Sequence, residues 1–232
     1  STVDRYADDI HYKGGCLLNE NLGWGSTMWA YSSRPPDPAL VGESWREMWL
    51  ERLNAQPFLP ATWLHHQQRD AYWQHGSVCE DYSAITAATL AVGGWGDSYK
   101  NAVPQLVENL STPVKGIVGP WVHKYPHFAV PEPRIGFLQE ALRWWDKWLK
   151  GIETGVENDP AYSVYLMDGV RPKTWYESRA GRWISEPEWP QGPILKSMYL
   201  GQGNTLNTVP IRINDILSSP QTCGMSSGEY CA

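Results

Sequence analysis

The chain has 232 residues, a formal net charge of −6 and a mean hydropathy of −0.45, and 42% of its residues are hydrophobic. This length can bury one large core or two small ones, and the composition is that of an ordinary globular protein. The acidic balance and the lack of any basic run argue against nucleic acid or a membrane surface as partner. No apolar stretch approaches the ~20 residues of a transmembrane helix, and the compositional outlier is fourteen Trp against three Phe.

The first part of the chain predicts a layer of short helices interrupted by proline. In residues 38–53 apolar side chains recur at spacings of three and four, which indicates an amphipathic helix after the proline-rich break before it. A second helical stretch is predicted over residues 63–75. Trp45 and Trp49 of the first helix are candidates to wall a substrate pocket, and packing within the helical layer is an equally open alternative.

From residue 83 the pattern becomes that of a parallel α/β unit. Residues 89–94 (TLAVGG) and 114–118 (VKGIV) are short apolar runs, typical of buried strands. The apolar stripe between them predicts a helix with Asn101 as its N-cap and Pro104 in its first turn. A strand, a helix and a strand in this order form a parallel βαβ unit.

The clearest helical stripe of the chain lies over residues 134–150 and stops at Gly151. Beyond it, residues 162–167 alternate in character, and further short apolar runs are separated by Gly and Pro. This pattern predicts the beginning of an all-β domain.

A glycine-flanked turn follows each predicted strand of the βαβ unit. The first turn (GGWGDSY, residues 93–99) holds Asp97, and the second (GPWVH, residues 119–123) ends at His123. One strand–helix–strand step brings both to the carboxyl edge of the sheet, where functional groups gather. An Asp that accepts a hydrogen bond from an imidazole fixes its tautomer, and Asp before His is the order in α/β-hydrolases. A turn-forming Asp and a merely hydrogen-bonded His are the alternative.

Five blocks carry a wider resemblance. In chain order they are DRYADDIHYKGG, HQQRDAYWQHGSVCEDY, GGWGDSY, GPWVH and IGFLQEALRWWDKWLKG. Together they resemble the X-prolyl dipeptidyl-peptidase and cocaine esterase (CocE/NonD) family of serine hydrolases, over almost the whole chain and in the family's order.

The resemblance implies an α/β class fold: a partial α/β-hydrolase domain, a parallel sheet with flanking helices, that carries a helical cap and leads into a jelly-roll-like β domain. Residues 1–82 correspond to the cap region, residues 83–152 to the C-terminal part of the hydrolase core, and residues 153–232 to the beginning of the β domain. By the same resemblance Asp97 is the triad acid, His123 the triad base and Tyr99 a residue that lines the acyl pocket.

The family's nucleophilic serine precedes the cap, and no matching segment is found in this sequence. The resemblance therefore implies an internal fragment, inactive by itself, of a hydrolase that cleaves an acyl ester, X-prolyl peptide or amino-acid ester. A non-catalytic binding fragment and one chain of a split hydrolase are the alternatives. A homo-oligomer, or a chain that carries the missing N-terminal part, is an open expectation for partners, and a cytoplasmic location is expected from the unpatterned cysteines.

The other histidines, the cysteines and a serine motif are further candidate sites. His65, His66 and His75 lack the spacing of a metal site, so no metal or organic cofactor is expected. The GMSSG segment (residues 224–228) matches G-x-S-x-G, but no strand leads into it and it follows the Asp and His, so we expect a loop there. A disulfide between Cys223 and Cys231 is conceivable and is not required by the sequence. His127 is the rival to His123 as base.

Overall fold

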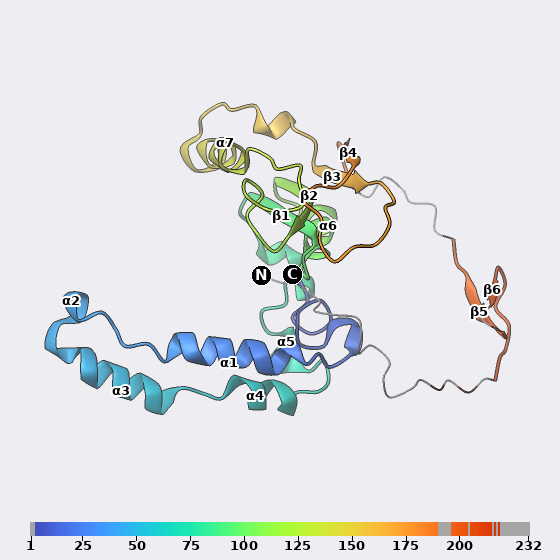
Figure 1. Cartoon of the computed structure of the whole chain (residues 1–232). Helices are drawn as coiled ribbons and strands as arrows, with labels where there is room; N and C mark the ends of the chain where they lie inside the picture. The colour runs from blue at the N-terminus through green and yellow to red at the C-terminus, as the bar shows by residue number, and fades with distance from the viewer. Residues whose placement is uncertain (1–2, 190–195, 204, 215, 217, 219–232) are drawn as a thin grey trace.

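The computed structural model describes residues 3–189, 196–203, 205–214, 216 and 218. A four-stranded sheet in the order β1-β2-β3-β4 forms its centre, and an arm of helices reaches away from this sheet (Figure 1). The helices of the N-terminal part are α1 (Glu20–Ser32), α2 (Pro38–Val41), α3 (Trp45–Ala55), α4 (Leu59–His65) and α5 (Ala71–Gln74). The central elements are β1 (Thr89–Gly96), α6 (Ala102–Asn109), β2 (Val114–Val122), α7 (Phe137–Lys150), β3 (Tyr162–Met167) and β4 (Gly181–Glu186). A separate hairpin pairs β5 (Tyr199–Gly201) with β6 (Thr205–Asn207).

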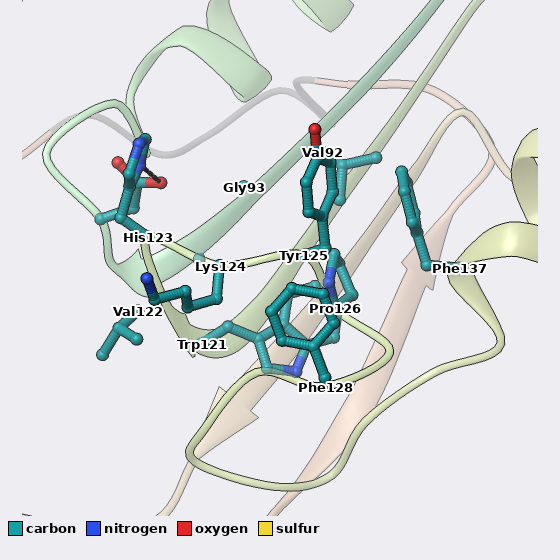
Figure 2. A pocket seen from close by; sticks show the side chains of 12 residues that line it. Val92, Gly93, Trp121, Val122, His123, Lys124, Tyr125, Pro126, Phe128 and Phe137 are labelled. Atoms are coloured by element: carbon teal, nitrogen blue, oxygen red, sulfur yellow. Dashed lines mark hydrogen bonds and ion pairs between the residues drawn. The ribbon is translucent and has the colours of Figure 1, made fainter.

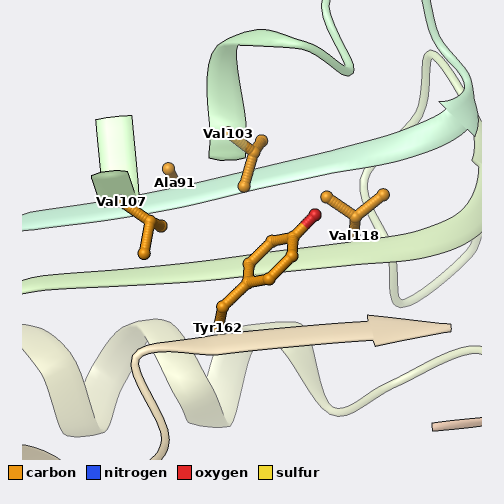
Figure 3. Close-up of a cluster of buried hydrophobic side chains, with 5 residues drawn as sticks. All are labelled: Ala91, Val103, Val107, Val118 and Tyr162. Atoms are coloured by element: carbon orange, nitrogen blue, oxygen red, sulfur yellow. The ribbon is translucent and has the colours of Figure 1, made fainter. Parts of the chain in front are cut away.

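The predicted βαβ unit is confirmed. Strand β1 pairs in parallel with β2, from Thr89 opposite Val114 to Gly96 opposite Val122, and α6 connects them. Strand β2 is buried along nearly its whole length, as expected of a strand covered on both faces. One face carries a cluster of interlocking apolar side chains from β1, α6, β2 and β3 (Figure 3): Ala91, Val103, Val107, Val118 and Tyr162.

Helix α7 covers the opposite face of the sheet. Because side chains alternate along a strand, Lys115 of β2 points away from the α6 side, and its Nζ lies 2.9 Å from Glu140 of α7 and also contacts Asp159. Arg143 lies 3.1 Å from both of these carboxylates. Burial raises the pKa of Asp159, but the hydrogen bonds from Lys115 and Arg143 outweigh it and hold that pKa below its usual range. This ionic cluster fixes α7 to the sheet.

The helical arm consists of α1 to α4 (Figure 1), and two of its helices make a close contact. Helix α1 packs against α4 at Gly25, where any added Cβ would overlap the ring of Pro60. Further along the arm, Trp49 of α3 donates from Nε1 to the carbonyl oxygen of Ser33 (2.7 Å). The side chains of Tyr12, Trp63 and Trp73 are buried together at the base. The arm itself exposes large apolar side chains, among them Leu22, Trp24, Trp29 and Leu40.

The structure differs from the prediction in two helices and in the extent of the central sheet. The helix predicted over residues 38–53 is interrupted at Gly42, which adopts a left-handed conformation (φ 62°) that favours glycine. The helix predicted over residues 63–75 is two short ones, α4 and α5. Strand β3 pairs in parallel with β2, and β4 pairs with β3, so the central sheet continues past residue 153, where we expected the β domain to begin.

Two predicted helix ends have different outcomes. Gly151 follows α7 in the left-handed conformation (φ 69°), as expected of a C-terminal glycine. Asn101 precedes α6, but its side chain does not cap the helix and instead donates to Asp8. Within the described ranges, no helix has the length and apolar character that a membrane crossing requires.

Candidate active site

Asp97 and His123 meet at the carboxyl ends of two adjacent parallel strands. Asp97 follows the last residue of β1, and His123 follows the last residue of β2. The register of the two strands shifts between Gly94 and Gly96, so that Gly96 lies opposite Val122. As a result Nδ1 of His123 lies 2.8 Å from Oδ2 of Asp97, the contact drawn as a dashed line in Figure 2.

The carboxylate of Asp97 is held by its own turn. Its Oδ1 accepts the backbone N–H of Tyr99 (2.9 Å), and its backbone N–H donates to the carbonyl oxygen of Gly94 (3.0 Å). The Asp97 side chain is 13% exposed, whereas that of His123 is 63% exposed. Because Nδ1 faces a carboxylate, it carries the proton, and Nε2 is left with the lone pair that a general base needs.

A cavity of ≈ 510 Å³ opens beside the pair. Its wall is mainly aromatic and comes from the end of β2, the loop after it and the first residue of α7 (Figure 2): Trp121, Tyr125, Phe128 and Phe137. Val92, Gly93 and Gly94 of β1 form its floor, and no serine lines it within the described part of the chain. The pair therefore borders an apolar cavity suited to an apolar group.

The remaining predicted site residues are distributed as follows. The ring of Tyr99 lies 5.7 Å from the imidazole of His123, so the structure brings these two together. Trp45 and Trp49 lie on α3, where their rings stack at 6.1 Å, and neither lines the cavity beside the pair. The structure does not bring these two Trp residues to Asp97.

The other histidines have different surroundings. The ring of His127 lies parallel to that of Phe137 at 6.1 Å and edge-on to Phe128 at 4.6 Å. The imidazole paired with Asp97 is that of His123. Nδ1 of His66 lies 2.6 Å from Oδ2 of Asp70, and Oδ1 of Asp70 accepts the backbone N–H of Tyr72 at the start of α5. This second His–Asp pair lies in the helical region and serves as a helix cap.

The described residues contain no group of three or more His, Cys, Asp or Glu side chains arranged to hold a metal ion. The GMSSG segment (residues 224–228) and the pair Cys223 and Cys231 lie outside the described residues.

Sequence reasoning missed a set of contacts behind Asp97. Lys13 donates from Nζ to the carbonyl oxygen of Ser98, and Asn101 donates from Nδ2 to Oδ1 of Asp8 (3.0 Å). These contacts join segments 85 and 93 residues apart. No local pattern marks such pairs, although the two glycines after Lys13 signal a sharp turn there.

Comparisons with known proteins place the chain in a family. The model of the X-Pro dipeptidyl-peptidase (S15) family matches residues 1–125, more than half of the 232 residues. The chain belongs to this family. The crystal structure of a CocE/NonD family hydrolase from Staphylococcus aureus superposes with a TM-score of 0.56 at 15% identity, covering 90% of this chain and 33% of that one. The S15 chain thus has part of the α/β-hydrolase fold, as the sequence predicted.

Two curated relatives match part of the chain. Proteins named "Putative serine esterase" from Mycobacterium bovis and Mycobacterium tuberculosis are each 28% identical over 142 residues, covering 58% of this chain. The aligned region is 20% of their length, so the S15 chain spans about a fifth of these relatives.

Proposed function

We propose that the protein is a serine hydrolase that cleaves an ester or amide bond through an acyl-enzyme, with Asp97 as triad acid and His123 as triad base. The observation that carries the proposal is the 2.8 Å contact between His123 Nδ1 and Asp97 Oδ2 at the ends of neighbouring parallel strands. Membership of the S15 family supports it, and so does the serine esterase name of the curated relatives.

The proposed reaction follows from this geometry. A serine oxygen bonds to the substrate carbonyl carbon while its proton passes to Nε2 of His123, and Asp97 stabilises the imidazolium. His123 then gives this proton to the leaving alcohol or amine as the carbon–heteroatom bond breaks. In the second half water attacks the acyl carbon and loses a proton to His123. His123 then gives this proton to the serine oxygen as the acyl–oxygen bond breaks, which releases the acid and restores the serine.

We propose that this serine lies outside the 232 residues. α/β-Hydrolases place the serine before the Asp and the His in chain order, and within the described residues the cavity beside the pair has no serine in its lining. Loss of the nucleophile costs on the order of 10⁶-fold in rate, so the 232 residues alone are expected to be inactive.

The cavity supports a substrate with an apolar group on one side of the scissile bond. Tyr125, Phe128 and Phe137 line the same cavity as His123 (Figure 2), and such aromatic surfaces favour apolar or aromatic groups through burial of area. Acyl esters, X-prolyl peptides and amino-acid esters are the substrate classes to compare.

The test is hydrolysis by the protein expressed from its whole gene. We would assay p-nitrophenyl butyrate, p-nitrophenyl benzoate and an X-Pro p-nitroanilide with the wild type, His123→Ala and His66→Ala. The last variant is a matched control, because it removes the histidine of the other His–Asp pair. We expect His123→Ala to lower kcat by more than ~10³-fold and His66→Ala to change it little. Equal losses in both variants, or no turnover of any substrate, would contradict the proposal.

A further inference from the structure

The segment that precedes the helical arm folds back on itself. We name residues 4–15 the N-terminal strap. Within it, the backbone N–H of Tyr12 donates to the carbonyl oxygen of Tyr6 (3.2 Å), and that of Gly14 to Ala7 (2.9 Å). Gly14 and Gly15 both have positive φ angles (63° and 84°), which allow the chain to turn directly after Lys13.

One side of the strap is anchored in the base of the arm. The buried ring of His11 packs against Trp63 and Trp73, at 4.4 and 4.8 Å between centroids. Asn21 donates from Nδ2 to the carbonyl oxygens of His11 and Leu18 (2.8 Å each), so its Oδ1 accepts from Nδ1 of His11 (2.7 Å). These buried contacts therefore hold this side of the strap in a defined position.

The other side of the strap holds the turn that carries Asp97. Nζ of Lys13 donates to the carbonyl oxygen of Ser98, the residue next to Asp97, and to that of Asp8 (3.2 Å). Nζ of Lys13 also lies 3.6 Å from Oδ1 of Asp8, which accepts from Asn101 (3.0 Å). The strap thus contacts the turn at two points, at Ser98 directly after Asp97 and at Asn101 just before α6.

These contacts are buried, so the loss of one of them should affect the position of the turn. The side chains of Lys13 and Asp8 are 14% and 10% exposed, and Ser98 is fully buried. A charge in such a place is unfavourable unless it is paired and hydrogen-bonded, and removal of one partner leaves the other uncompensated. Replacement of Lys13 therefore releases the Ser98 carbonyl and loosens the turn at Asp97.

We propose that Lys13, together with Asp8, is a positioning residue that holds the Asp97 carboxylate in line with Nδ1 of His123. This inference rests on the proposed function, because it assigns these residues to the same Asp–His pair. Neither side chain touches the imidazole in the contacts described. Lys13 acts on the turn through the carbonyl oxygen of Ser98, and Asp8 acts through the side chain of Asn101. A misplacement of about 1 Å can cost ~10²-fold in rate, so the effect belongs to kcat and not to substrate binding.

The experiment measures kcat and KM for Lys13→Met in the protein expressed from its whole gene, with a p-nitrophenyl ester. We expect kcat to fall roughly 10- to 100-fold with KM within about twofold of the wild type. Lys147→Met is the matched control. That lysine lies on α7, is 17% exposed and forms ion pairs with Glu153 and Glu157 beyond the end of the helix, and its replacement should leave kcat unchanged.

A double mutant separates positioning from a merely structural role. In an Asp97→Asn background the carboxylate that Lys13 positions is already gone, so Lys13→Met should lower kcat by less than a further ~2-fold. A full and independent loss in that background would overturn the inference, as would a lower melting temperature with unchanged kcat. If Lys13→Met does not fold, Asn101→Ala, which removes only the bond to Asp8, must show the same non-additivity. An inactive wild type would instead count against the proposed function itself.

Discussion

Replacing Asp97 with Asn tests the pair by exchanging one oxygen for an NH₂ group. In the structure the backbone N–H of Tyr99 donates to Oδ1 and His123 faces Oδ2. In Asp97→Asn the amide oxygen must stay opposite the Tyr99 N–H, since an NH₂ group there would meet another donor. The NH₂ group then faces Nδ1 of His123, which must accept. The imidazole proton moves to Nε2, the nitrogen that has to take the proton of the serine.

The expected magnitude follows from this change of tautomer. In a serine protease triad the Asp→Asn change lowers kcat ~10⁴-fold, which corresponds to about 5.4 kcal/mol at 1.36 kcal/mol for each factor of ten. Stability should barely change, because the His123 side chain is largely exposed and the hydrogen bond survives with its direction reversed. Exposed pairs of this kind contribute about 0–1 kcal/mol to the free energy of unfolding.

The assay is steady-state hydrolysis of a p-nitrophenyl ester by the protein from the whole gene, together with thermal melting. Asp70→Asn is the control, because it makes the same exchange in the His66–Asp70 pair and should keep wild-type kcat. A loss of kcat smaller than about tenfold in Asp97→Asn would refute the tautomer argument. So would a loss that simply follows a lower melting temperature.

Two further predictions concern stability. Burial lowers the pKa of His11, and the hydrogen bond to Asn21 offsets this only in part; the unfolded chain therefore binds the proton more tightly. The free energy of unfolding should therefore fall as the pH drops below about 6.5. His11→Gln should flatten this dependence in melts from about pH 7.5 to 5. The same change of stability with pH in the wild type and the variant would contradict this prediction. In Gly94→Ala the added Cβ overlaps the Trp121 carbonyl oxygen between β1 and β2, so denaturant unfolding should show a loss of about 1–3 kcal/mol. In Gly23→Ala on α1 the added Cβ would make only an ordinary contact, 3.9 Å from Oε1 of Glu20. This change should be neutral or stabilising by about 0.5–1 kcal/mol, and similar effects at both sites would argue against the close approach of the strands.

The central βαβ unit and α7 were predictable because their residues carry local patterns. Buried parallel strands are short apolar runs with glycine at their ends, and α7 has a regular apolar stripe with Gly151 after it. The two residues of the site follow from the same logic, since parallel strands bring their carboxyl ends to one edge. Spacing and order made Asp97 and His123 candidates, and the resemblance to the family singled them out from the turn-forming alternative. The structure brings the two side chains to 2.8 Å.

The features that sequence reasoning missed are long-range or depend on single residues. The break at Gly42 interrupts an otherwise regular apolar stripe through one backbone conformation. The pairing of β3 with β2 depends on a crossover through α7, which alternation within residues 162–167 does not reveal. For Trp45 and Trp49 the sequence left a pocket wall and packing within the helical layer equally open, and the structure places both on α3 with their rings stacked. Contacts such as that between Lys13 and Ser98 have no signature in either segment alone.

Fluorophosphonate labelling, read by intact mass and then by peptide mapping, tests the central claim most directly. The sample is the protein expressed from its whole gene, compared with its His123→Ala variant. We predict a single adduct on a serine that precedes residue 1 of this sequence, and loss of that adduct in His123→Ala. An adduct on a serine within the 232 residues, or labelling that survives in His123→Ala, would contradict the assignment of Asp97 and His123 as the acid and base of a serine hydrolase triad.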